Sequence, residues 1–205
     1  LEKKSEVKEP LPLQNEKKSV ENNKLQFLPR MQIRDEKPLK LALFKRNGLW
    51  WLLLNDTIEN IKIKTVNGVK ILKASAGENY SLFYIAFAKN LEPKITQTGN
   101  LWDVMFVEQN KDTEDQKLSF IIKDVPTKPR YLFLNTESLG QKATVFDEVS
   151  GCNLQVMMLD ADRHGMANFK MPEVEVLETA NGIAICSYSD KISLEPTDNG
   201  YNIVS

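Results

Sequence analysis

The sequence predicts an all-β protein made of consecutive antiparallel hairpins, and three observations lead to this fold class. First, about fourteen short segments rich in aliphatic and aromatic residues follow one another, with Gly or Pro between them. Second, Asn-Gly pairs stand at 47–48, 67–68, 181–182 and 199–200, and Asn followed by Gly tolerates the positive φ angles of two-residue hairpin loops. Third, no segment shows a convincing amphipathic helical period.

Residues 1–38 differ from the rest of the chain. Lys and Glu dominate this segment, prolines interrupt it, and its sparse apolar residues follow no steady period. Such a composition buries too little surface to offset the entropy of ordering. We therefore predict a flexible charged linker or tail over 1–38 and one all-β domain over 39–205. Residues 25–33 are the exception, because their apolar side chains could dock as an edge strand, and a segment that folds on a partner is the alternative for the tail.

The two clearest hairpins lie at the start of the predicted domain. Residues 39–45 and 49–54 flank Asn47-Gly48, and residues 61–66 and 69–72 flank Asn67-Gly68. Side chains alternate along a strand, so Trp50 and Trp51 point to opposite faces. A run that is apolar on both faces predicts a central strand that is covered on both sides.

The remaining expected strands are 80–88, 101–107, 117–122, 131–134, 143–146, 152–158, 173–177, 183–186, 191–194 and 201–204. Asn-Gly recurs with similar spacing, and four strands in about 40–50 residues is the size of a propeller blade. The chain would supply between three and four such blades. The sequence thus predicts propeller-blade-like repeats in an incomplete propeller, with a β-sandwich as the alternative.

Composition limits the classes of partner. The chain has 27 Lys plus Arg and 28 Asp plus Glu, for a net charge of −1, which argues against a chain-wide nucleic-acid surface. No window has the roughly 20 apolar residues of a membrane-spanning helix.

Cys152 and Cys186 are interpreted as two small buried hydrophobic residues, and a disulfide between them is the alternative.

One cluster has the look of a metal site. Asp160, Asp162 and His164 alternate ahead of Gly165, but a calcium loop of the EF-hand type would have Asp or Asn at the position of His164 and Glu at that of Met171. We interpret the cluster as a polar turn. The sequence therefore predicts no metal, no cofactor and no catalytic residue, and an enzyme with a carboxylate site is the least favoured hypothesis.

A ligand or partner surface is the remaining candidate site. Trp50, Trp51, Tyr84 and Trp102 could form a platform for a glycan or a peptide if one strand face were exposed. Aromatic residues at strand spacing are more often part of a core. The platform requires these four side chains to be exposed, whereas the core requires them to be buried.

Three segments carry a resemblance to known proteins: 44–51 (FKRNGLWW), 145–156 (VFDEVSGCNLQV) and 174–185 (VEVLETANGIAI). They resemble the β-rich repeats of large bacterial envelope proteins that also carry tetratricopeptide repeats. The resemblance implies an extracytoplasmic, non-catalytic module and carries over no functional residues. Residue 1 is Leu, so we expect a piece of a longer protein. We hypothesise a structural or protein-interaction module of the cell envelope, and a glycan- or peptide-binding module as the alternative.

Overall fold

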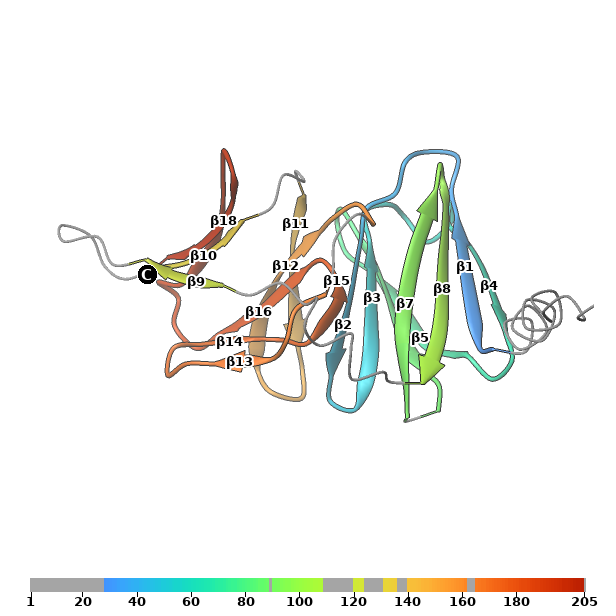
Figure 1. Ribbon diagram of the computed structural model, residues 1–205, viewed down its shortest axis with the longest axis horizontal. Helices are drawn as coiled ribbons and strands as arrows, with labels where there is room; N and C mark the ends of the chain where they lie inside the picture. The colour runs from blue at the N-terminus through green and yellow to red at the C-terminus, as the bar shows by residue number, and fades with distance from the viewer. Residues whose placement is uncertain are drawn as a thin grey trace, which may run out of the picture.

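The computed structural model describes residues 28–88, 90–108, 120–123, 131–135, 140–161 and 165–204. Within these ranges the chain forms eighteen strands and no helix, arranged in four antiparallel sheets (Figure 1). The predicted all-β class is confirmed. No helix of the described residues is long and apolar enough to cross a membrane.

Sheets I and II come mainly from the first half of the chain. Sheet I has the order β4 (Lys62–Val66), β1 (Arg30–Arg34), β8 (Leu101–Glu108) and β7 (Leu91–Thr98). Sheet II has the order β15 (Thr179–Asn181), β2 (Leu41–Arg46), β3 (Leu49–Leu54), β6 (Ser81–Ala86) and β5 (Lys70–Ala76). The chain passes repeatedly between these two sheets as it proceeds.

Sheets III and IV come from the second half. Sheet III has the order β11 (Gln141–Asp147), β12 (Cys152–Met158), β16 (Ile183–Ser187), β14 (Val174–Val176) and β13 (Phe169–Lys170). Sheet IV has the order β17 (Ser193–Thr197), β18 (Gly200–Val204), β10 (Tyr131–Asn135) and β9 (Ile121–Lys123).

Three apolar cores hold the sheets in the order I, II, III, IV. Core 1 joins sheets I and II through Met31, Ile33, Trp102, Val104 and Phe106 on one side and Leu41, Leu43, Trp50, Leu52, Leu54, Phe83 and Ile85 on the other. Core 2 joins sheets II and III through Ala42, Phe44, Trp51, Leu53 and Leu82 on one side and Ala143, Val145, Leu154, Val156, Met158 and Ala184 on the other. Core 3 joins sheets III and IV through Met157, Val176, Ile183, Ile185, Leu132, Leu134, Tyr201 and Ile203. Strand β3 is therefore covered on both faces, as its sequence predicts.

The Asn-Gly pairs behave differently from one another. Asn47 (φ 51°) and Gly48 (φ 75°) form the expected two-residue loop, and β2 pairs with β3 along its whole length. Asn67 (φ 56°) and Gly68 (φ 88°) also have positive φ angles. The hairpin expected there is wrong, however, because β4 pairs with β1 in sheet I whereas β5 pairs with β6 in sheet II.

The later pairs also depart from the expectation. Gly182 (φ 77°) marks the point where the chain leaves sheet II and enters sheet III, so 181–182 is a crossover and forms no hairpin. The β17–β18 hairpin does form, but Thr197 lies opposite Gly200 and its two loop residues are Asp198 and Asn199. Asn-Gly specifies the local backbone here, and the sheets decide which strands pair.

The predicted tail boundary at residue 38 is also wrong. Strand β1 lies between β4 and β8 inside sheet I, so it is an inner strand and not the edge strand expected for 25–33. Met31 and Ile33 are fully buried in core 1. The alternation of only two apolar residues in β1 was too short a signal against its charged surroundings. Residues 1–27 of the expected tail lie outside the described part of the chain.

Strand β7 was not predicted because Pro93 interrupts it and its apolar residues are few. It occupies an edge of sheet I, which is where a sheet tolerates Pro.

The four sheets, stacked face to face, are compatible with both the incomplete propeller-like arrangement and the β-sandwich. The strand order, in which the chain alternates between sheets I and II, favours the sandwich.

Strand β15 connects the second half of the chain to a sheet of the first half. It belongs to the second half of the sequence but pairs with β2 in sheet II. Asn181 is fully buried, and its Nδ2 donates hydrogen bonds to the carbonyl oxygens of Leu41 (2.7 Å) and Leu159 (3.2 Å). A side chain at Gly182 would collide with the Met157 carbonyl oxygen at 2.6 Å, so glycine is required for the close approach of the sheets.

Candidate functional site

The structure places the four candidate aromatic residues mainly inside the protein. Trp102 is 0% exposed, Trp51 3% and Trp50 8%. Trp102 donates its indole N–H to the Leu39 carbonyl oxygen at 3.1 Å in core 1. The expectation that these residues form an exposed aromatic strand face is therefore wrong, because neighbouring sheets cover both faces of β3 and the inner face of β8.

Tyr84 is the one member of the set that stays half-exposed. Its ring meets Trp51 edge-on with centroids 4.7 Å apart, and the ammonium group of Lys73 lies 5.8 Å from its centroid. This pair closes the margin of core 2 and packs as aromatic pairs in cores do. Tyr84 therefore offers a small exposed patch and no platform.

Trp50 is one of the residues that line an open depression of about 750 Å³. Trp50 stacks with Phe87 at a centroid distance of 6.2 Å, and Phe87 packs on Phe106 at 3.9 Å. Lys45 and Glu178, which also line the depression, form an ion pair with Nζ and Oε2 3.7 Å apart. Aromatic and charged side chains thus both line the depression, which suits a small amphipathic ligand.

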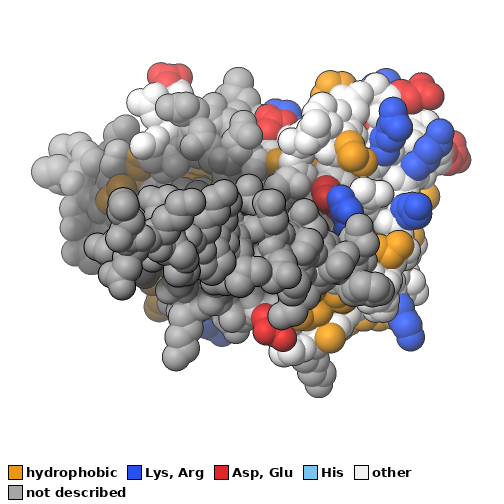
Figure 2. Space-filling model, turned by 45° about the vertical axis from the view of Figure 1, so that its right-hand side comes forward, with side chains coloured by type: hydrophobic (Ala, Val, Ile, Leu, Met, Phe, Trp, Pro, Cys, Tyr) orange, Lys and Arg blue, Asp and Glu red, His pale blue; other side chains and the backbone are white. Residues whose placement is uncertain are grey.

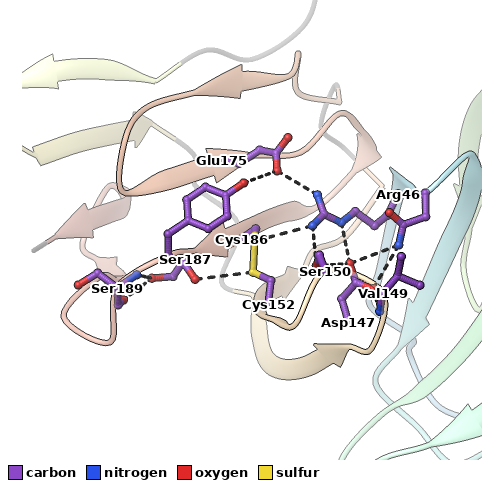
Figure 3. The surroundings of a disulfide bond; sticks show 11 residues. Arg46, Asp147, Val149, Ser150, Cys152, Glu175, Cys186, Ser187 and Ser189 are labelled. Atoms are coloured by element: carbon purple, nitrogen blue, oxygen red, sulfur yellow. Dashed lines mark hydrogen bonds and ion pairs between the residues drawn. A yellow bond between two sulfur atoms is a disulfide. The ribbon is translucent and has the colours of Figure 1, made fainter.

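The strongest polar network is centred on Arg46 at the junction of sheets II and III (Figure 3). Its Nε donates to Asp147 Oδ2 and its Nη1 to Glu175 Oε2, each at 2.9 Å. Ser150 donates its hydroxyl to Asp147 at 2.6 Å, and the Tyr188 hydroxyl donates to Glu175 at 2.9 Å. Only 11% of the Arg46 side chain and 1% of the Asp147 side chain are exposed. Each buried charged group in the network contacts a group of opposite charge. Because Arg46 belongs to sheet II and the two carboxylates to sheet III, these contacts connect the two sheets.

The same network adjoins a disulfide between Cys152 and Cys186, which corrects our interpretation of them as free buried residues (Figure 3). The bond joins the neighbouring strands β12 and β16, with the two Cα atoms 6.0 Å apart. Arg46 Nη2 lies 3.8 Å from Cys186 Sγ. Sequence spacing alone could not decide the pairing, because the pairing of β12 with β16 skips the three strands that lie between them in the chain, β13, β14 and β15.

The network makes stability sensitive to acid. Burial raises the pKa of Asp147, but hydrogen bonds from Ser150 and Arg46 outweigh it and lower that pKa below its ordinary value of 3.8. Burial also raises the pKa of Glu175, but the hydrogen bonds from Tyr188 and Arg46 outweigh it and leave that pKa below its ordinary value of 4.5. A carboxyl group with a lowered folded-state pKa stabilises the fold above its unfolded-state pKa, and this stabilisation disappears as the pH falls through the folded-state value.

We therefore expect the free energy of unfolding to be steady above the ordinary Glu value of 4.5 and to decline as the pH falls below it. Urea denaturation at a series of pH values measures this. Asp147→Asn serves as the comparison, because it removes one of the titrating groups and should flatten the decline. An equally steep decline in the variant would show that other carboxylates control the acid response.

The outer face of sheet I is the main charged surface. Arg34 on β1, Lys62 and Lys64 on β4, and Lys94 on β7 are exposed and alternate with residues of core 1. No carboxylate in the described ranges forms an ion pair with any of them. Figure 2 shows Lys and Arg side chains gathered at the end of the molecule that sheet I forms.

Other chemistry finds little support among the described residues. They contain no group of three or more His, Cys, Asp or Glu side chains arranged to hold a metal ion. Asp160 lies 3.6 Å from Lys40 Nζ, while residues 162–164 of the sequence cluster lie outside the described ranges. Comparison of the chain with protein-family models, with curated proteins and with solved structures finds no match.

Proposed function

We propose that the chain is a non-catalytic protein-interaction module of a larger bacterial envelope protein, and that the outer face of sheet I binds an acidic segment of a protein partner. One observation carries the proposal: Lys62 and Arg34 lie directly opposite each other on neighbouring strands. Like charges in this position destabilise a sheet. Features that oppose stability are expected where a surface serves binding.

Protection of a sheet edge explains only some of the exposed Lys and Arg side chains on sheet I. Lysine on an edge strand prevents unwanted strand pairing, and this covers Lys62 and Lys64 on β4. It does not cover Arg34, because β1 is an inner strand. The exposed apolar side chain of Val66 on β4 would add contact area for a partner. An anionic, partly apolar polypeptide therefore matches this face.

The envelope location is supported by the disulfide. Structural disulfides persist in oxidising compartments such as the bacterial periplasm and are rare in the cytosol. Cys152–Cys186 is consistent with such a compartment, as is the resemblance of 145–156 and 174–185 to envelope repeats. Alkylation of free thiols in intact cells, followed by mass spectrometry, tests this location, since alkylated Cys152 and Cys186 would contradict it.

We expect Lys62→Glu/Lys64→Glu to weaken binding of a Glu-rich extended peptide by about tenfold or more, since each exposed charge pair contributes up to about 1 kcal/mol. Fluorescence anisotropy with the labelled peptide measures the affinity, and added salt should weaken wild-type binding. The matched control is Lys170→Glu/Lys191→Glu, which changes net charge equally at two exposed positions away from sheet I, on β13 and in the turn before β17.

Three results would contradict the proposal. The first is equal loss of binding in the control, which would show a nonspecific charge effect. The second is no peptide binding by the wild type. The third is binding to anionic lipid vesicles in preference to the peptide, which would assign the face to a membrane surface.

The depression beside Trp50 supports a second candidate function, the binding of a glycan or peptide ligand. We expect tryptophan fluorescence to change on titration with cell-wall glycan or peptide fragments, because Trp50 lines the depression. Ala88→Arg should abolish the change, since Ala88 also lines it and is exposed. Thr144→Arg, an exposed position on sheet III, is the control. Unchanged fluorescence with every fragment would dismiss this function.

A further inference from the structure

Strand β4 leaves one edge of sheet I open. All five residues of β4 pair with β1 without a register shift, and no strand of the described ranges pairs with its other edge (Figure 1). An open edge presents a row of backbone N–H and C=O groups that can pair with an added strand. The backbone of β4 is therefore available to a further strand of sheet I.

Most other sheet edges are protected against such an addition. Strands β7 and β17 contain Pro93 and Pro196, the pairing of β5 with β6 shifts register, and β9, β13 and β15 are only two or three residues long. Strand β11 is regular, but its Lys142 already donates to the Leu194 carbonyl oxygen at 3.0 Å. Among the described residues, β4 alone combines a regular open edge with lysine side chains that have no hydrogen-bond or ion-pair partner there.

The inner side of this edge is apolar and incompletely covered. Ile63 on β4 packs against core 1 but is only partly buried. Only residues 67–69 join β4 to β5, so the open edges of these two strands lie on the same side of the stacked sheets. Ile71 on β5 lies opposite Ile85 of core 1 and points to the same side of sheet II, yet it is 38% exposed because sheet I ends at β4. A strand added beside β4 would cover Ile71 and extend core 1.

The outer side of the same edge carries positive charge. Lys62 and Lys64 are exposed on β4, and Arg34 lies opposite Lys62 on β1. An acidic side chain on an added strand would lie beside one of these lysines, where opposite charges on neighbouring strands stabilise a sheet. A second copy of β4 fits poorly, because full antiparallel overlap of the two strands places their Lys64 side chains opposite each other.

We propose that the acidic segment of the partner binds as a fifth strand of sheet I, paired with β4, and that it alternates Glu or Asp with apolar residues. Strand addition rests on the proposed function and specifies how its acidic partner binds. The acidic residues lie beside Lys62 and Lys64, and the apolar residues cover Ile63 and Ile71. Main-chain hydrogen bonds to β4 give affinity, and the alternating side chains give specificity.

Peptides with methylated backbone amides test strand addition on the full wild-type chain. In a paired strand, the N–H groups of every second residue point to the neighbouring strand and the others point away. The probe is a labelled peptide of about ten residues in which Glu and Val alternate, made unmodified, N-methylated on the Val residues only, or N-methylated on the Glu residues only. By fluorescence anisotropy, we expect one methylated form to lose about tenfold or more in affinity and the other to stay within about threefold of the unmodified peptide.

A matched pair of variants tests the inner side of the edge. Ile71→Glu should weaken binding of the unmodified peptide about fivefold or more, because it places a carboxylate against the apolar side of the added strand. Val149→Glu makes the same change in charge at an exposed position in the turn after β11 and should bind like the wild type.

Two outcomes would overturn strand addition. The first is equal affinity of the two methylated forms, and the second is an equal effect of Ile71→Glu and Val149→Glu. With either result and intact binding of the unmodified peptide, the acidic segment lies across the outer face of sheet I and the proposed function stands. No binding of any of the three peptides would overturn both.

Discussion

Replacing Arg46 by methionine is expected to lower the free energy of unfolding by about 3 kcal/mol or more. Methionine keeps much of the side-chain volume but removes the charge that Asp147 and Glu175 share. Asp147 then remains almost fully buried without its cation, and removing one partner of a buried ion pair is among the most destabilising single changes. Sheets II and III would lose their main polar connection.

Urea denaturation at neutral pH measures this effect, and Arg34→Met is the matched control. Arg34 is exposed and lies opposite Lys62, so its loss should change stability by less than about 0.5 kcal/mol. If Arg46→Met destabilises no more than the control does, the network is a surface feature of little energetic weight. A double-mutant cycle with Asp147→Asn would isolate the pairwise contribution.

The second large effect is expected from the disulfide. Cys152→Ala/Cys186→Ala should lower the free energy of unfolding by about 3–4 kcal/mol, because the bond closes a loop between residues 34 apart and restricts the unfolded chain. The two sulfur atoms lie in core 2, so the alanines also remove packed volume there.

Denaturation with and without a dithiol reductant separates these contributions. Reductant should destabilise the wild type and leave the double-alanine variant unchanged. A wild-type protein with the same stability in both conditions would mean that the bond does not form in solution. In that case the original interpretation of two free, buried cysteines would hold.

The sequence predicts the strands well because strand formation is local. Residues 49–54 and 152–158 were predicted with the bounds that β3 and β12 have, since each is a continuous apolar run between turn residues. Strand pairing is not local. Asn67-Gly68 provides the correct turn geometry, yet β4 pairs with β1 in sheet I and β5 pairs with β6 in sheet II.

The candidate sites were harder to predict for the same reason. Asp147 and Glu175 lie 101 and 129 residues from Arg46 along the chain, so the sequence gives no sign that the three side chains meet. The tryptophans are buried, as aromatic residues at strand spacing usually are, and the exposed platform that was the alternative does not form.

Strand β15 has a consequence for synthesis on the ribosome. The edge of β2 that β15 covers is complete only when residues 179–181 have been translated, about 135 residues after β2 itself. At roughly 5–20 residues per second, this leaves the nascent chain with an open sheet edge for on the order of ten seconds. During that interval neighbouring copies could donate the missing segment to one another, so the first half of the protein is the part most in need of a chaperone.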